Sequence, residues 1–326
     1  MTTTIIDADS KNTIYTGLST DSKPTPIITY SGEPRISIFY ETDTKDIYRH
    51  DGSSWSMVES SGRKMVSDPY VDIIRGSTPN YTLVNKFGAM TTSGTHTTWK
   101  PITSSESWFA PLLAYALEAV SDDNTNDVAG GAGIRAIRIY GIKTPTSTTE
   151  ETEDVNLNGT TAVSLANSWW RIYRVVAIES GTYGGVGSYS HNSTITVREI
   201  ATPANVWASI TSDSTFGFSQ SEISCYSIPT GKTAVILNYR VEISNSNGSV
   251  NVILAVRENS DDFIAPFEPI QVKAIHKNLS AGEIITNDPD APVHFVTGPA
   301  DIFMMSRNGS NQTYDLISRM QILVIN

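Results

Sequence analysis

Cysteine, charge and long apolar runs are all scarce in this 326-residue chain. Its single cysteine, Cys225, excludes an intrachain disulfide, so we expect a buried, unreactive thiol and assembly in a reducing cytoplasm. No apolar run approaches the ~20 residues that span a bilayer, and the first residues lack the basic and apolar regions of a signal peptide. Neither a membrane partner nor a cleaved export signal is therefore expected.

The scarcity of charge also narrows the function. Charged residues make up 17% of the chain and the formal net charge is −11. The longest basic run is Arg63-Lys64. Because binding to DNA or RNA depends on clustered Lys and Arg, no nucleic-acid partner is predicted.

In contrast, Ser, Thr, β-branched and aromatic residues are abundant. Two turn peptides, residues 157–163 (LNGTTAV) and 228–234 (IPTGKTA), are each followed by a run of β-branched and aromatic residues. Thr-rich exposed faces and turn signals between short apolar runs are typical of antiparallel sheets. The sequence therefore predicts an all-β protein with sandwich or jelly-roll units.

Four regions are expected along the chain. Residues 1–30, with Pro24 and Pro26, are predicted to be an extended N-terminal arm. Residues 31–75 are predicted to form a small β-meander, with strands at 36–40, 47–50 and 54–58 and a hairpin turn at Asp51-Gly52. Residues 76–200 would form a first β-sandwich unit, and residues 201–326 a second β-sandwich or jelly-roll unit.

Alternating patterns predict individual strands within the two larger units. In the first unit, residues 109–118 fit either a helix or a strand over 113–120, and 143–154 are expected to be an exposed excursion. The remaining strands of that unit are expected at 134–142, 155–157, 169–178 and 194–197. Strands of the second unit are expected at 206–210, 224–228, 235–243, 250–256, 269–274, 293–296, 301–305 and 317–325.

No pattern predicts catalysis, a cofactor or a metal. The five histidines lack metal-ligand spacing, and the glycines at 130–133 precede a strand rather than the helix that a phosphate site needs. Residues 122–127 (DDNTND) offer oxygen ligands for a cation, but they depart from the EF-hand pattern. The Gly-rich residues 181–187 fit an ordered turn or subunit contact better than a ligand loop. A carboxylate pair for glycan cleavage stays open, because separation in space decides that chemistry.

Tryptophans are the candidate interface residues. Adjacent Trp169 and Trp170 should face opposite sides of one strand, so that one fills the core while the other meets solvent, a neighbouring subunit or another domain, with a subunit interface favoured. Aromatic side chains are enriched in protein interfaces. The predicted interface set is Trp99, Trp108, Trp169, Trp170 and Trp207.

Five short motifs occur in a fixed order: residues 85–88 (NKFG), 131–135 (GAGIR), 157–163 (LNGTTAV), 171–174 (RIYR) and 228–234 (IPTGKTA). The series resembles a group of virion structural proteins of tailed bacteriophages, cyanophages included. This resemblance covers roughly residues 80–260, and no single motif in it is specific. Residues 41–55 separately resemble a short module of phage tail and fibre proteins, whereas the first 75 residues otherwise depart from the group.

The resemblance implies a non-enzymatic, β-rich virion component that forms a homo-oligomer, often a trimer. Such a protein would decorate or stabilise the capsid, or form a head fibre, after assembly in the host bacterial cytoplasm. Residues 1–30 would dock on the major capsid protein or on neck or tail proteins, while loops 143–154 and 181–192 project outward. The alternatives are a neck or tail component, a tail-borne adhesin that recognises a host surface glycan, and a capsule depolymerase.

Overall fold

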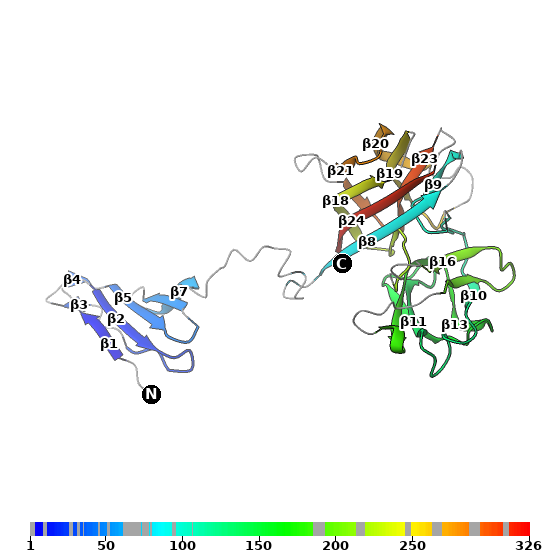
Figure 1. Ribbon diagram of the computed structural model, residues 1–326. Coiled ribbons are helices and arrows are strands. Elements are labelled where there is room, and N and C mark those ends of the chain that lie inside the picture. Colours follow the sequence, from blue (N-terminus) through cyan, green and yellow to red (C-terminus); the bar gives the residue numbers. More distant parts are fainter. Residues whose placement is uncertain are drawn as a thin grey trace. The chain divides into compact units, whose positions relative to one another are not determined.

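The protein is all-β, as the sequence predicts, and the computed structural model divides it into two compact units (Figure 1). Unit 1 comprises Met1–Thr78 and unit 2 comprises Pro79–Asn326. The structure describes all residues except 1–3, 9–11, 26–28, 31–32, 35, 45, 51–52, 61–72, 74–77, 79, 93–95, 106, 185–192, 213–218, 245–248, 263–268, 287–293 and 309–312. No helix of the described residues is long and apolar enough to cross a bilayer.

Unit 1 contains a five-stranded sheet in the order β1-β2-β5-β6-β7. The expected meander is present as three antiparallel strands, whereas its Asp51-Gly52 turn lies outside the described residues. Strand β2 pairs in parallel with β5. The bounds are β1 (Thr4–Ala8), β2 (Asn12–Gly17), β3 (Thr29–Tyr30), β4 (Glu33–Pro34), β5 (Ile36–Glu41), β6 (Asp46–His50) and β7 (Trp55–Ser60).

The expectation of an extended arm over residues 1–30 is wrong for its first half, because β1 and β2 belong to this sheet. The side chains of Tyr15 and Phe39 are buried, and the ring of Trp55 packs edge-on against both at 6.1 Å. The Trp55 indole also donates a hydrogen bond to the carbonyl of Pro24. The aromatic core of this small sheet therefore fixes β2 and the proline segment after it.

Unit 2 consists of two antiparallel sandwiches, which we call lobe 1 and lobe 2. Lobe 1 stacks a four-stranded sheet, β13-β10-β15-β16, on a three-stranded sheet, β12-β11-β14. Its elements are β10 (Tyr115–Ser121), β11 (Ile134–Ile142), β12 (Glu151–Asn156), β13 (Val163–Trp169), β14 (Arg171–Ser180), the single 3₁₀ turn η1 (Thr182–Gly184), β15 (Ile195–Glu199) and β16 (Val206–Ile210).

Lobe 2 stacks two five-stranded sheets. One has the order β21-β18-β24-β8, with β22 also on β18, and the other has the order β17-β23-β19-β20, with β9 also on β23. The bounds are β8 (Tyr81–Thr92), β9 (His96–Pro101), β17 (Cys225–Ile228), β18 (Thr233–Ser244), β19 (Val250–Glu258), β20 (Gln271–Leu279), β21 (Ile284–Thr286), β22 (His294–Thr297), β23 (Ala300–Asn308) and β24 (Tyr314–Ile325).

The strand pairing of lobe 2 departs from the expected division at residue 200. Strands β8 and β9, assigned to the first sandwich, pair instead with β24 and β23 of lobe 2. Strand β16, assigned to the second sandwich, pairs with β15 of lobe 1. Of the two alternatives for residues 109–118, the structure has the strand, as β10, and the supposed excursion 143–154 contains the start of β12.

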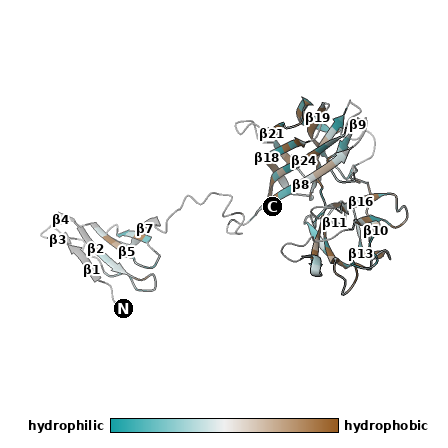
Figure 2. Cartoon of the chain, in the orientation of Figure 1, coloured by the Kyte–Doolittle hydropathy of each residue, from teal (hydrophilic) through white to brown (hydrophobic). Residues whose placement is uncertain are grey.

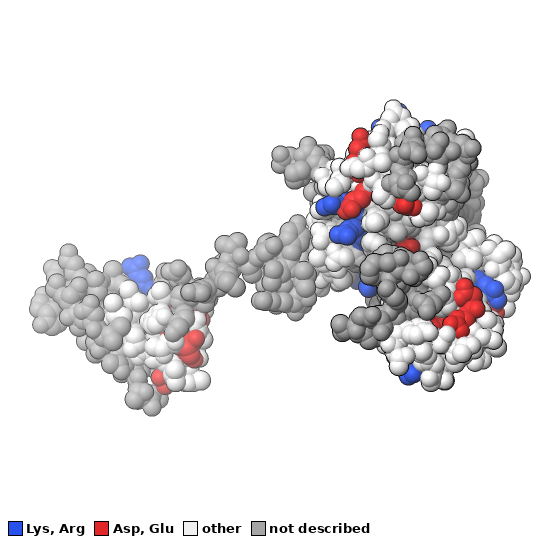
Figure 3. Space-filling view, in the orientation of Figure 1, with Lys and Arg blue, Asp and Glu red and all other residues white. Residues whose placement is uncertain are grey.

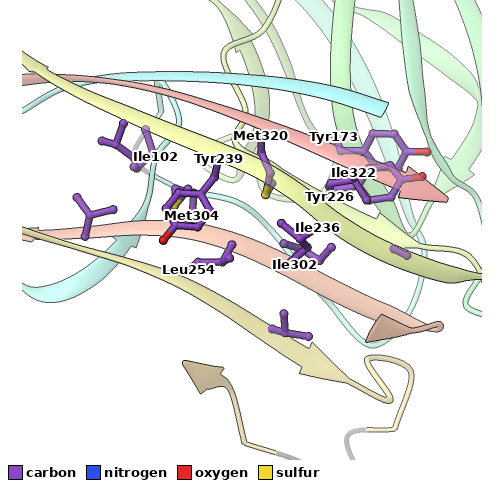
Figure 4. Packing of buried hydrophobic residues seen from close by; sticks show 14 of the residues in the cluster. Ile102, Tyr173, Tyr226, Ile236, Tyr239, Leu254, Ile302, Met304, Met320 and Ile322 are labelled. Carbon is purple, nitrogen blue, oxygen red and sulfur yellow. The ribbon is translucent and has the colours of Figure 1, made fainter. Parts of the chain in front are cut away.

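Each lobe has its own apolar core. In lobe 2 the inward side chains of β18 and β24 meet those of β19 and β23, and Ile236, Leu254 and Ile302 lie between the two layers (Figure 4). Apolar and polar residues alternate along much of β18 and β24 (Figure 2), whose apolar side chains face the core. In contrast, β19 and β23 are buried along most of their length. Cys225 is buried in the core of lobe 1, as expected, and burial raises the pKa of its thiol.

Candidate ligand-binding site

The two lobes join at the adjacent tryptophans. Trp169 ends β13 and is fully buried in the core of lobe 1, whereas Trp170 is fully buried in the core of lobe 2. Of the three environments expected for the second tryptophan, the structure shows packing against another domain, here the other lobe, because the chain bends at Trp170 as it passes from β13 to β14 in the other sheet. The favoured alternative, a subunit interface, does not fit this burial. Neither side chain is accessible to a partner.

The other predicted interface tryptophans also lie largely inside the protein. Trp207 is 2% exposed and stacks on Phe109, with their ring centroids 6.0 Å apart. Trp108 is 9% exposed, and its indole donates a 2.7 Å hydrogen bond to the carbonyl of Ile172. Only Trp99, which is partly exposed and lies under the guanidinium of Arg307, keeps surface that a partner could reach.

A buried ion pair fixes the lobe junction. Arg171, at the start of β14, forms a bidentate pair with Asp301 of β23, at 3.1 and 3.0 Å, and both side chains are fully buried. The guanidinium also donates to the carbonyls of Pro111 and Trp170, and it lies 3.9 Å above the ring of Trp170. The hydroxyl of Ser227 donates to Asp301 at 2.6 Å. A buried pair with this many hydrogen bonds gives the two lobes one fixed arrangement.

The acidic segment 122–127 serves the fold. The Asp123 carboxylate accepts hydrogen bonds from the side-chain amide of Asn126 and from the backbone amides of Asn126 and Thr125, and these lower its pKa. Buried Asp127 accepts the Ile134 amide and the hydroxyls of Ser121 and Ser193. Among the described residues, no group of three or more His, Cys, Asp or Glu side chains has the arrangement of a metal site. The carboxylate oxygens that could have bound a cation are thus directed at donors of the chain itself.

A cavity of about 840 Å³ opens where the outer face of the β8–β24–β18 sheet meets lobe 1. Its volume is in the range of small-ligand sites, roughly 300–1,000 Å³. Four strands of lobe 2, together with β14 and the segment before β17, contribute its lining. The lining residues are Asn85, Lys86, Phe87, Arg174, Gln220, Ser221, Asn238, Arg240, Thr286, Arg319, Met320 and Gln321.

Strand register explains how polar side chains gather at this cavity. Arg319 of β24 lies directly between Phe87 of β8 and Arg240 of β18, and Arg240 in turn lies opposite Thr286 of β21. Two residues along β24, Gln321 lies between Asn85 and Asn238. Because alternate residues of a strand share a face, these two rungs present an arginine row beside an amide row on the outer side of the sheet.

The lining carries positive charge in an acidic protein. Four of its residues are Lys or Arg, and none of the described lining residues is Asp or Glu. Basic side chains lie over β18 and β24 in the view of Figure 3, with acidic neighbours beside them. Glu242 forms an ion pair with Arg240 at 2.8 Å. Burial raises the pKa of Glu150, and the charges of Lys86 and Arg174 act in the opposite direction. Arg319, in contrast, has no ion pair with any described residue.

Lys86 lies at the inner wall, where it joins the two lobes. Its ammonium donates a hydrogen bond to the carbonyl of Tyr173, and burial lowers its pKa to about 7. Desolvation has this effect because it disfavours the charged form. Next to it, a Cβ on Gly88 would lie 2.5 Å from the Cβ of Ser224, so only glycine lets β8 approach the segment before β17 this closely.

Sequence reasoning identified parts of this cavity without assembling them. The NKFG and RIYR motifs supply Lys86 and Arg174, whereas Arg240 and Arg319 only fall within the strands predicted at 235–243 and 317–325. The sequence did not predict that these two arginines are neighbours, because only the register of β18 and β24 places them side by side.

Comparisons with known proteins give little help with function. No protein-family model matches the chain, and no curated protein matches its sequence. Among solved structures, weak similarity is found to virus structures. A chain in the structure of the Gt strain of infectious bursal disease virus has 9% sequence identity to this protein, and the match covers 78% of this chain and 77% of that chain with a TM-score of 0.19. The Gx strain is 10% identical over 76% and 71%, with a TM-score of 0.21. Scores this low carry no argument about fold or function.

Proposed function

We propose that the chain is a non-enzymatic structural protein of a tailed-bacteriophage virion, which decorates or stabilises the capsid or forms a head fibre as a homo-oligomer. The observation that carries the proposal is the place of the five motifs that resemble phage virion proteins. Each of them shapes a turn or a junction of the β-fold.

The glycines of these motifs show that role most directly. Gly159 of LNGTTAV has a φ of +59° in the turn from β12 to β13, and Gly231 of IPTGKTA has a φ of +78° between β17 and β18. Such angles favour glycine. Gly88 of NKFG lets β8 approach the segment before β17, and Arg171 of RIYR pairs with Asp301 across the lobe junction. The residues behind the resemblance therefore build a rigid scaffold, which suits a particle component.

A subunit contact would use a different surface from the tryptophans. Five large apolar side chains are exposed on or just before β20, β21 and β22, at the edges of the two sheets of lobe 2. They are Ile270, Val272, Ile275, Ile284 and Phe295, which is 66% exposed. Exposed apolar surface of this kind marks interaction sites. We propose it as the homo-oligomer contact and unit 1, rather than a free arm, as the element that docks on the capsid or on a neck or tail partner.

The test is a cryo-EM reconstruction of the particle that carries the chain. Density for unit 2 on the capsid lattice, with unit 1 against the shell, is the expected result. Density at the neck or distal tail would overturn capsid decoration in favour of a neck or tail component, and absence from purified particles would overturn the virion role. Light scattering of Phe295→Ser against the parent chain separately tests the oligomer contact, with dissociation expected.

A second candidate function, a tail-borne adhesin for a host surface glycan, is favoured by one observation. The cavity beside β24 combines amide and guanidinium groups on a fixed sheet. Preorganised polar groups in a cavity are typical of ligand recognition. Binding of purified protein to host cells, abolished by substitutions in the cavity, would test this function.

A further inference from the structure

We infer that the cavity beside β24 binds an acidic saccharide, a sugar that carries a carboxylate or sulfate group. The inference rests on the second candidate function, since it names the class of ligand that such an adhesin would hold. It is independent of where the protein sits on a particle.

The like-charge pair of Arg240 and Arg319 is the first argument. These side chains are direct cross-strand partners on adjacent strands, an arrangement that destabilises a sheet when both carry the same charge. Glu242 pairs with Arg240 alone. Arg319 is exposed at the cavity and has no ion pair within the described chain. An anion bound at Arg319 would relieve a repulsion that the described chain itself leaves uncompensated.

A second cation converges on the cavity from the other lobe. Arg174 of β14 is exposed, lines the same cavity, and lies over the ring of Tyr140 at 5.5 Å. Arginine is well suited to this role, because its planar guanidinium can donate two parallel hydrogen bonds to one carboxylate or sulfate. Since the buried ion pair of Arg171 and Asp301 fixes the lobes, the strands that carry Arg174 and Arg319 present both guanidinium groups to the same cavity.

The amide row distinguishes a saccharide from a simple anion. Asn85, Gln321 and Asn238 lie side by side across three strands, next to the arginine row. Each amide presents both donors and an acceptor, which matches the hydroxyl groups of a sugar. Phe87, also in the lining, offers an apolar surface for a ring face. An inorganic anion would use the arginines and leave these groups unused.

The charge distribution disfavours a nucleic-acid chain as the occupant. Only four of the 23 Lys and Arg residues line this cavity, and the chain as a whole has a net charge of −11. A polynucleotide requires a track of phosphate contacts, and its approach would be opposed by the rest of the surface. A short ligand with one or two negative groups meets only the local field.

Calorimetric titration of the full chain would test the inference. The probes are an oligogalacturonate and a heparin-derived tetrasaccharide as acidic sugars, maltotetraose as a neutral sugar, sodium sulfate alone, and a single-stranded oligonucleotide. We expect one or both acidic sugars to bind, with maltotetraose and sulfate at least about tenfold weaker, as the loss of charge-assisted hydrogen bonds implies.

Four single variants define the site. R319Q and R174Q, from the two lobes, should each weaken acidic-sugar binding about tenfold or more. R49Q removes the same charge from an exposed position in unit 1 and should leave binding unchanged. E242Q should strengthen binding, because it releases Arg240 from its ion pair; a gain of affinity cannot come from misfolding.

Three outcomes would overturn the inference. These are no binding of either acidic sugar up to about 10 mM, equal binding of sulfate or of the oligonucleotide, and an R49Q effect as large as that of R319Q. An adhesin that binds host cells while failing this titration would keep the proposed function and lose only this ligand class.

Discussion

The buried pair of Arg171 and Asp301 allows a quantitative prediction about unit 2. Asp301→Asn preserves the shape of the side chain but removes its charge and replaces one acceptor oxygen with an amide that faces the guanidinium. Both side chains are fully buried, so water cannot compensate. Removing one member of such a pair typically costs about 3–5 kcal/mol. We therefore expect the free energy of unfolding of unit 2 to fall by about that amount.

Urea and thermal unfolding would measure the loss. For a unit of this size, the expected fall in Tm is roughly 6–20 °C. Five of the six tryptophans, all except Trp55, lie in unit 2, so their fluorescence reports mainly on this unit. A transition for unit 1 that stays in place would serve as an internal control.

The double variant Arg171→Met with Asp301→Leu separates charge from shape. Replacing both partners with apolar groups is often nearly neutral. Here the Trp170 carbonyl would lose the Arg171 donor, a penalty of about 1–3 kcal/mol, whereas the Pro111 carbonyl keeps the Trp170 indole. We expect the double variant to be more stable than Asp301→Asn. A loss below about 1 kcal/mol for Asp301→Asn would refute the reasoning, since the pair would then be contributing no more than a surface pair.

Three further predictions concern the lobe junction and its surroundings. Because the folded pKa of Lys86 is about 7 and its ordinary value is 10.5, the unfolded state binds more protons between these values, and stability should rise with pH by up to about 1.4 kcal/mol per unit. Urea midpoints at about pH 7.5 and 8.5 should show this rise in the parent chain and a flatter response in Lys86→Met. These pH values lie below the range where the raised pKa of Cys225 would make stability fall with pH. Gly88→Ala should destabilise unit 2 by about 1–3 kcal/mol in the same unfolding assay, because its Cβ would clash with Ser224; an unchanged midpoint would show that β8 can shift. Asp127→Ala should cost about 1–3 kcal/mol through its stranded donors, with calcium having no effect on either protein's Tm.

The strands that the sequence predicted best are those with long alternating or apolar patterns. Residues 235–243, 250–256 and 317–325 fall within β18, β19 and β24. Buried and less buried side chains alternate along β24 and the second half of β18, whereas 250–256 is an almost fully buried apolar run. The prediction of an extended arm was wrong because it rested on the prolines at 24 and 26, which lie after the two strands that residues 4–8 and 12–17 form. The second of these strands pairs with β5, and the aromatic packing that fixes it is not visible locally.

The surroundings of the tryptophan pair and the cavity could not be predicted from local sequence patterns. Alternation predicts different surroundings for Trp169 and Trp170, and the two rings do enter different cores. It could not show that both are buried, because β13 ends at Trp169 and the chain then enters the other sheet. The cavity depends on the register of β8, β24 and β18, whose residues are far apart in the sequence. An outward Arg319 gains meaning only beside Arg240, and that neighbour is set by nonlocal pairing.

The pairing of β8 with β24 has a consequence for how the protein is made. These strands pair along their full twelve-residue lengths, although about 220 residues separate them. At 5–20 residues per second, a ribosome needs roughly 10–45 s to pass from one to the other. Throughout that interval β8 lacks its partner β24, and the sheet that carries the cavity cannot be completed. Neighbouring chains on one messenger RNA could therefore pair wrongly through β8 until β24 emerges from the ribosome. The pairing of β24 with β8 is then the step that completes the fold of each copy.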